Sequence, residues 1–118
     1  MTLKEASRQF CISMDRLKSY EENGLILCER LVDGIPDYTE EELGKAGLIH
    51  SLLESGMEME VLQKFMCLLR EKAESREEQV RILRRQRYRL LDEIHGKQQL
   101  LDELDYMISE KKKGGITK

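Results

Sequence analysis

The chain has 118 residues and a formal net charge of −3, and its side chains are 36% charged and 5% aromatic, with a single proline. This length allows one small domain and one extended element, and the composition favours long helices over a β-sandwich or barrel. The N-terminal segment has no apolar stretch of signal-peptide length and no later run approaches a membrane span, so we expect a cytoplasmic protein without membrane contact.

Two short helices are predicted at the N-terminus. Thr2 and Glu5 form a capping-box signature for a first helix of about two turns. A turn at Cys11 and Ile12 follows, after which Ser13 is a good N-cap for a second helix and Asn23–Gly24 supplies its C-cap. Two helices this close in sequence indicate a helix-turn-helix, the unit that places its second helix in the major groove of DNA.

The next segment is predicted to form a wing. Leu25–Cys28 is a short apolar run, Asp33–Gly34 is a strong turn pair, and Ile35–Tyr38 can return as an edge strand. A β-hairpin directly after a helix-turn-helix makes the unit a winged one.

Two further helices are expected before the C-terminal region. Thr39–Glu42 is a second capping box and opens a third helix, which should end around Ser55–Gly56. A fourth helix should run from about Glu58 to Arg70, and a polar stretch over 71–78 leads to the last element. We therefore place a winged helix-turn-helix domain at 1–70 and a linker, a dimerisation helix and a short frayed tail at 71–118.

The last helix carries an apolar stripe that a single chain cannot cover along its length. Its seam alternates steps of three and four residues over four heptads. The seam residues, our dimerisation candidates, are Val80, Leu83, Arg87, Leu90, Ile94, Lys97, Leu101, Leu104 and Ile108. Burying seven apolar side chains at ~1.5 to 3 kcal/mol each would drive dimerisation. The polar members Arg87 and Lys97 should lower the stability of the seam and set its register.

Charge then selects the orientation of the two helices. Residues 76–89 carry six arginines against two acids, whereas residues 92–110 carry six acids against one lysine. A parallel pair would place like charges side by side, but an antiparallel pair lays basic halves along acidic halves. The expected fold is thus all-α with a small β wing: a winged helix-turn-helix domain followed by a long antiparallel coiled-coil dimerisation helix.

Neither the cysteines nor the histidines indicate a chemical site. Cys11, Cys28 and Cys67 are odd in number and widely spaced, which fits a reducing compartment and neither a disulfide framework nor a zinc site. His50 and Glu54 share a helix face, but two ligands do not make a metal site. No nucleophile with its base and no phosphate-binding glycine loop is present. We therefore predict no enzyme, no metal and no cofactor, and no residue cluster points to an effector.

The order of these elements, and two of the motifs, resemble the MerR-type transcriptional regulators over nearly the full chain. Leu17-Lys-Ser-Tyr-Glu-Glu-Asn-Gly-Leu25 is similar to the signature Leu-Arg-Tyr-Tyr-Glu-Glu-x-Gly-Leu of that family. Asp33–Tyr38 and the following Thr39–Leu43 resemble its wing and next helix. The resemblance implies a homodimer that binds a pseudo-palindromic promoter site in double-stranded DNA and, in many relatives, twists the DNA to help RNA polymerase.

Positions in the family motif supply the DNA-contact candidates. Lys18 stands where the family usually has a backbone-contacting arginine, Tyr20 matches the second tyrosine, and Arg16 occupies a groove-facing position. Arg30 lies at the start of the wing. With three residues at the exposed start of the recognition helix, the candidates are Met14, Asp15, Arg16, Lys18, Ser19, Tyr20 and Arg30.

An alternative function follows from the departures and from the charge of the N-terminal half. Ser19 replaces an aromatic, Cys11 replaces a glycine of the turn, and Pro36–Asp37 stands where the wing normally offers an arginine. Residues 1–70 hold 8 Lys+Arg against 13 Asp+Glu, a net charge of −5, whereas residues 71–118 hold 12 against 10. Phosphate neutralisation supplies most non-specific DNA affinity. The alternative is a degenerate winged-helix dimer that acts as a protein-interaction module without DNA binding.

Overall fold

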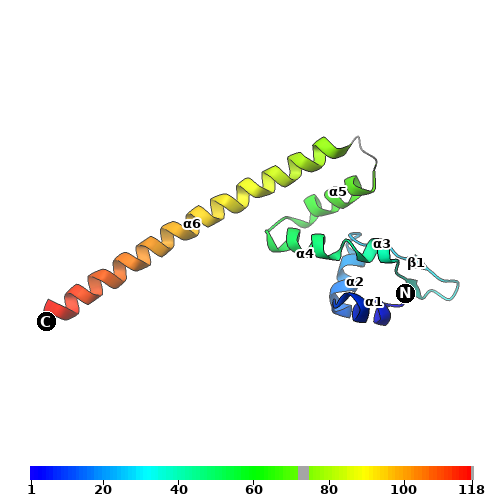
Figure 1. The fold of residues 1–118 in the computed structure, drawn as a ribbon, viewed down its shortest axis with the longest axis horizontal. Coiled ribbons are helices and arrows are strands. Elements are labelled where there is room, and N and C mark those ends of the chain that lie inside the picture. Colours follow the sequence, from blue (N-terminus) through cyan, green and yellow to red (C-terminus); the bar gives the residue numbers. More distant parts are fainter. Residues whose placement is uncertain (72–74, 118) are drawn as a thin grey trace. The chain divides into compact units, whose positions relative to one another are not determined.

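The computed structural model describes residues 1–71 and 75–117, with side chains through residue 114. The chain divides into two compact units, Met1–Ile82 and Leu83–Lys118. The elements in order are α1 (Leu3–Phe10), α2 (Met14–Glu22), β1 (Glu29–Arg30), β2 (Pro36–Asp37), α3 (Glu40–Leu43), α4 (Ala46–Glu54), α5 (Met59–Arg70) and α6 (Arg76–Thr117) (Figure 1). The winged helix-turn-helix followed by a long C-terminal helix is confirmed.

The helix-turn-helix forms through the local signals that predicted it. The Thr2 hydroxyl accepts from the Glu5 N–H and the Glu5 carboxylate accepts from the Thr2 N–H, a complete capping box at α1. The Ser13 hydroxyl caps α2 by accepting from the N–H of Arg16. Gly24 follows α2 with φ +74°, a left-handed conformation that glycine adopts without steric cost.

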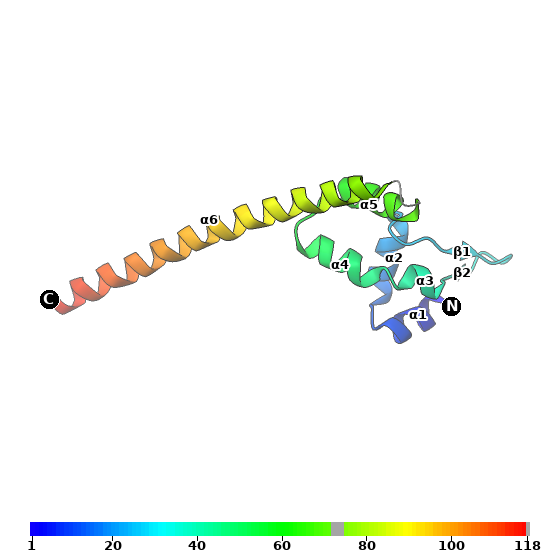
Figure 2. The same ribbon diagram turned by 45° about the horizontal axis from the view of Figure 1, so that its top comes forward.

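The wing is a two-stranded antiparallel hairpin that extends from the helices of the first unit (Figure 2). Glu29 pairs with Asp37 and Arg30 with Pro36, and Gly34 supplies the positive φ of the turn. The first strand begins later than the apolar run at 25–28 had indicated. Leu25 and Ile26 are fully buried instead, because they close the core beneath the wing.

The third predicted helix is two helices in the structure. α3 ends at Leu43 and α4 begins at Ala46, with Gly44 and Lys45 between them. The Lys45 N–H bonds to the Glu42 carbonyl three residues back, a tighter turn than an α-helix makes. Glycine at the break has low helix propensity, which favours an interruption there. The capping box at Thr39 is half-formed, because Thr39 accepts from the Glu42 N–H while the Glu42 side chain is bound elsewhere.

One hydrophobic core holds the first unit together. It takes side chains from every helix of that unit, among them Ala6 of α1, Leu17 of α2, Ile49 of α4 and Leu62 of α5, all fully buried. Ile82 of α6 is part of the same core, so the first turns of α6 belong to this unit and the boundary between units falls inside α6.

The second unit is the remainder of α6. The helix continues to Thr117, through the segment from Lys111 where we had expected a frayed end. Residue 118 and part of the predicted linker, residues 72–74, lie outside the described residues. Glycine at 96 does not interrupt the helix.

Candidate nucleic-acid interface

The start of α2 presents an exposed surface made of the predicted contact residues. Leu17 is fully buried and fixes the rotation of the helix, so its neighbours on the outer side face solvent. The exposed candidates are Met14, Asp15, Arg16, Lys18 and Ser19. The structure therefore brings five of the seven predicted DNA contacts together on one helix.

Tyr20 does not belong to this surface. Its side chain is 4% exposed and packs in the core, because α2 buries residues 17 and 20 on the same face. The structure thus gives no support to a DNA contact by the ring of Tyr20, which serves packing instead. Desolvation by burial raises the pKa of its hydroxyl.

Cations without an ion pair gather on the helix-turn-helix. Within residues 1–71, four of the eight Lys and Arg side chains are bound to acids: Arg30 to Glu21, Lys45 and Arg70 to Glu42, and Lys64 to Glu78. The other four are exposed and carry no ion pair in the described part of the chain: Lys4, Arg8, Arg16 and Lys18. All four lie on α1 and α2. The net charge of −5, which is counted over residues 1–70, is therefore not the charge of the helix-turn-helix alone.

Arg30, the wing candidate, is held by the end of the recognition helix. Its Nη2 lies 2.6 Å from Glu21 Oε1, and its Nη1 donates to the Gly34 carbonyl at 3.4 Å. The Arg30 side chain is still 55% exposed. A phosphate contact by Arg30 remains a prediction, and it would have to compete with Glu21.

Glu21 also receives two donors from the base of the wing. The Cys28 Sγ donates to Oε1 at 3.0 Å and the Tyr38 hydroxyl donates to Oε2 at 2.9 Å. The hydrogen bond from Cys28, together with Tyr38 and Arg30, lowers the pKa of Glu21 although burial opposes it. Burial and the same carboxylate raise the pKa of the Cys28 thiol to about 11, so this thiol is unreactive at neutral pH.

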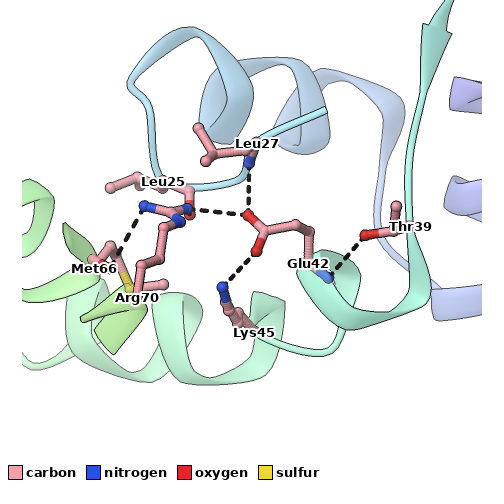
Figure 3. A network of polar contacts seen from close by, with 7 residues as sticks. All are labelled: Leu25, Leu27, Thr39, Glu42, Lys45, Met66 and Arg70. Carbon is pink, nitrogen blue, oxygen red and sulfur yellow. Dashed lines mark hydrogen bonds and ion pairs between the residues drawn. The ribbon is translucent and has the colours of Figure 1, made fainter. Parts of the chain in front are cut away.

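A second carboxylate joins the wing base to the following helices. Glu42 Oε1 accepts from the Leu27 N–H at 2.8 Å and from Arg70 Nη2 at 3.0 Å, and Lys45 bonds Oε2 (Figure 3). Arg70 also donates to the Leu25 carbonyl at 3.1 Å. Burial would raise the pKa of Glu42, but its donors outweigh burial and hold that pKa below its ordinary value. The wing is therefore anchored at Glu21 and at Glu42.

The tip of the wing is apolar. Leu31 is 52% exposed, Ile35 is 44% exposed and Val32 is fully exposed. Asp33 lies among them and accepts from the Ile35 N–H, which orders the turn. The Asp37 carboxylate lies 2.6 Å from the Met1 backbone nitrogen. The tip thus offers hydrophobic side chains and an acid where a phosphate-gripping wing would offer cations.

The predicted seam of α6 is exposed in the single chain. Its seven apolar members are 37% to 55% exposed, and Arg87 and Lys97 are exposed as well. Further exposed apolar side chains of α6 are Tyr88, Leu100, Tyr106 and Met107. This much apolar surface on one helix is typical of an interaction face.

Sequence reasoning missed two parts of the interface. Lys4 and Arg8 are spaced by four residues on the outer face of α1, a signal that was available. The role of Glu21 had no such signal, because its partners lie up to 17 residues away and meet it only in the folded chain.

Two site classes find no support in the described ranges, 1–71 and 75–117. They contain no group of three or more His, Cys, Asp or Glu side chains that could hold a metal ion. None of their helices is both long and apolar enough to cross a lipid bilayer.

The first unit, Met1–Ile82, is called the head below. It is a winged helix-turn-helix with an exposed recognition helix, α2, and this arrangement defines a class of regulatory DNA-binding folds. Residues 1–68 match the model of the MerR HTH family regulatory proteins. The chain belongs to the MerR family.

Solved structures support this assignment. A protein from Listeria monocytogenes described as a MerR family transcriptional regulator is 30% identical, with a TM-score of 0.76 over 92% of this chain and 83% of that one. HiNmlR, a MerR family regulator that lacks the sensor domain and is bound to promoter DNA, is 23% identical, with a TM-score of 0.71 over 92% and 86%. A Bacillus cereus MerR family regulator shares the fold at 22% identity and a TM-score of 0.68, over 93% and 81%. No curated protein matches the chain.

Proposed function

We propose that the protein is a dimeric, cytoplasmic transcriptional regulator that binds a pseudo-palindromic promoter site. The observation that carries this proposal is the placement of the unpaired cations. The only Lys and Arg side chains of residues 1–71 without an ion pair are those of α1 and α2, the two helices that meet DNA in a helix-turn-helix. The HiNmlR structure, with promoter DNA bound, supports the same use of the fold.

In the proposed complex α2 of each protomer enters a major groove. Arg16 and Lys18 neutralise DNA phosphates or reach base edges. Lys4 and Arg8 of α1 lie along the sugar-phosphate backbone of the DNA. Few cations serve each head, so sequence discrimination would rest largely on the shape and deformability of the DNA. RNA polymerase at the same promoter is a further proposed partner.

The dimer would form through α6. Its exposed apolar seam would be covered by the seam of a second copy, and the basic segment 76–89 would lie along the acidic segment 92–110 of that copy. The separation of the two recognition helices would then set the spacing of the half-sites in whole helical turns.

Salt-dependent binding tests the DNA contact. Genomic fragments retained by the protein are selected first, and the affinity of the best fragment is then measured by fluorescence anisotropy over a range of salt concentrations. Lys18→Ala should weaken binding to every fragment alike and lower the slope of log affinity against log salt by about 1 per lost phosphate contact, thus about 2 for a dimer.

Lys64→Ala is the matched control, because it removes the same charge from the same domain but from α5. It should leave the slope unchanged. Equal slopes for wild type and Lys18→Ala would exclude Lys18 as a phosphate contact.

The wing favours a second candidate function. Its arginine is bound to Glu21 and its tip is apolar and acidic, which suits a protein partner better than a phosphate backbone. In this alternative the dimer is a protein-interaction module without DNA binding. If no genomic duplex is retained even at low salt, this candidate replaces the first.

A further inference from the structure

The head contains a cavity of about 320 Å³ between the recognition helix and α4. Its apolar lining includes Phe10, Ile12 and Leu43. The helix junction opposite α2 carries glycine at positions 44 and 47. The cavity is open at residue 47, where no atom lies within 4 Å of the position that a Cβ would take. The volume lies at the lower end of ordinary ligand pockets, which suits a ligand with a single ring.

Three polar side chains line the same cavity. Arg16 and Tyr20 come from one face of α2, four residues apart, and His50 comes from α4. Arg16 has no ion pair in the described residues. His50 Nε2 lies 3.6 Å from Glu54 Oε1. Burial and, less strongly, the Glu54 carboxylate raise the pKa of the Tyr20 hydroxyl. An apolar floor with a guanidinium at its rim is the pattern that binds an amphipathic anion.

Tyr20 supplies a hydrogen-bond donor to the cavity. The residue is only 4% exposed, and its hydroxyl has no hydrogen-bond partner among the described residues. The hydroxyl oxygen is accessible to solvent, and Tyr20 is one of the residues that line the cavity. A hydroxyl that is open to a cavity can donate a hydrogen bond to a ligand oxygen there.

We propose that this cavity binds a small monocarboxylic acid with one ring or a branched apolar body. The apolar body lies against Phe10, Ile12 and Leu43, the carboxylate accepts from the Arg16 guanidinium, and the Tyr20 hydroxyl donates to the same carboxylate. The cavity would then be an effector site within the DNA-binding head.

A consequence for regulation rests on the proposed DNA binding. Arg16 is exposed on the recognition helix and lines the cavity, so it cannot serve a ligand carboxylate and a phosphate at once. The ligand should therefore weaken DNA binding several-fold, and DNA should weaken ligand binding by the same factor.

The test uses the full chain, labelled with ¹⁵N, and benzoate as the probe. Amide resonances of residues 44, 47 and 50 should shift with benzoate and saturate, with a Kd of the order of 1 mM for so small a ligand. Inorganic phosphate is the comparison, because it offers charge without an apolar body and should not shift these three amides.

Gly47→Leu fills the cavity and should weaken benzoate binding at least tenfold, while the helical circular dichroism stays unchanged. Gly114→Leu, the same substitution in α6, is the matched control and should bind benzoate like wild type. Arg16→Gln leaves the cavity open and should also weaken binding about tenfold, which keeps the test decisive if Gly47→Leu fails to fold.

The absence of saturating shifts would overturn the proposed site, as would unchanged binding by Gly47→Leu. Equal shifts with benzoate and phosphate would show that both anions bind only an exposed arginine, and the proposed site would be overturned. Because these measurements contain no DNA, their failure is separate from a failure of DNA binding. If benzoate binds the cavity but does not change the affinity of the protein for a selected DNA fragment, the proposed ligand site stands and the regulatory consequence is overturned.

Discussion

Cys11 is the residue at which local backbone geometry and side chain disagree. It ends α1 with φ 56° and ψ 42°, and it is the one non-glycine residue with positive φ in the described chain. For a residue with a Cβ atom, this left-handed conformation costs roughly 1–2 kcal/mol of conformational free energy. The thiol is exposed and is not needed for the core. The helix-turn-helix therefore forms despite its turn residue.

Cys11→Gly should stabilise the head. Relief of the left-handed conformation is partly offset by the larger entropy of glycine in the unfolded chain, so we expect a gain of about 0.5–1 kcal/mol. Urea unfolding followed by circular dichroism at fixed protein concentration measures it. Cys11→Ala keeps the Cβ and should leave stability nearly unchanged. Equal stabilities for the two variants would show that the turn is unstrained.

At the scale of elements, two carboxylates hold the wing to the helices. Glu21 connects the end of α2 with Arg30 and Tyr38, and Glu42 connects α3 with the Leu27 backbone and with Arg70 of α5. The Glu42 side chain is 15% exposed and that of Arg70 is 23% exposed, so water screens this pair only partly. The position of the wing therefore depends on ionised side chains.

Glu42→Gln should destabilise the head by about 1–3 kcal/mol at pH 7, because Arg70 and Lys45 lose their anion while partly buried. The pKa of Glu42 in the folded chain is below its ordinary value of 4.5. The ion pairs therefore contribute fully above that ordinary value, and the contribution is lost as the pH falls through the lower, folded value. Urea unfolding at several pH values should show the gap between wild type and variant closing as the pH falls below about 4.5.

Glu41→Gln is the control for this effect, since it removes a neighbouring exposed acid of the same helix turn. It should change stability by less than about 0.5 kcal/mol at any pH. A gap between wild type and Glu42→Gln that does not depend on pH would refute the ionic explanation.

At the scale of the whole molecule, the proposed dimer makes a geometric demand. Val80 and Ile108 lie 14 residues on either side of Ile94, so an antiparallel pair with its two-fold axis at Ile94 would place residue 80 beside residue 108 of the second copy. In a parallel pair each seam residue would instead meet the residue of the same number in the second copy.

Engineered cysteines distinguish the two arrangements. With the exposed native cysteines replaced by serine, an equal mixture of Val80→Cys and Ile108→Cys chains should form a mixed disulfide rapidly on oxidation. Each variant alone should form little, while Ile94→Cys should crosslink with itself. Efficient self-crosslinking of Ile108→Cys would indicate a parallel pair, and a monomer in sedimentation would remove the dimer altogether.

The elements whose causes are local are set by the order of the amino acids alone. The capping boxes, the Asn23–Gly24 stop and the Asp33–Gly34 turn act within a few residues, and the three-four spacing of α6 is a property of one helix. For this reason the helix-turn-helix, the wing and the long C-terminal helix could all be predicted. The α3–α4 break was missed because a capping box and apolar spacing outweighed a single glycine in our interpretation.

Which side chains are free to act depends, in contrast, on three-dimensional packing. Tyr20 fits a DNA-contact motif but packs in the core, and Arg30 fits another but is bound by Glu21. Glu42 and Arg70 are 28 residues apart. The cavity joins Arg16 to His50, which are 34 residues apart (50 − 16). No periodicity encodes such meetings, because burial and ion pairing depend on which helix faces the packed core brings together.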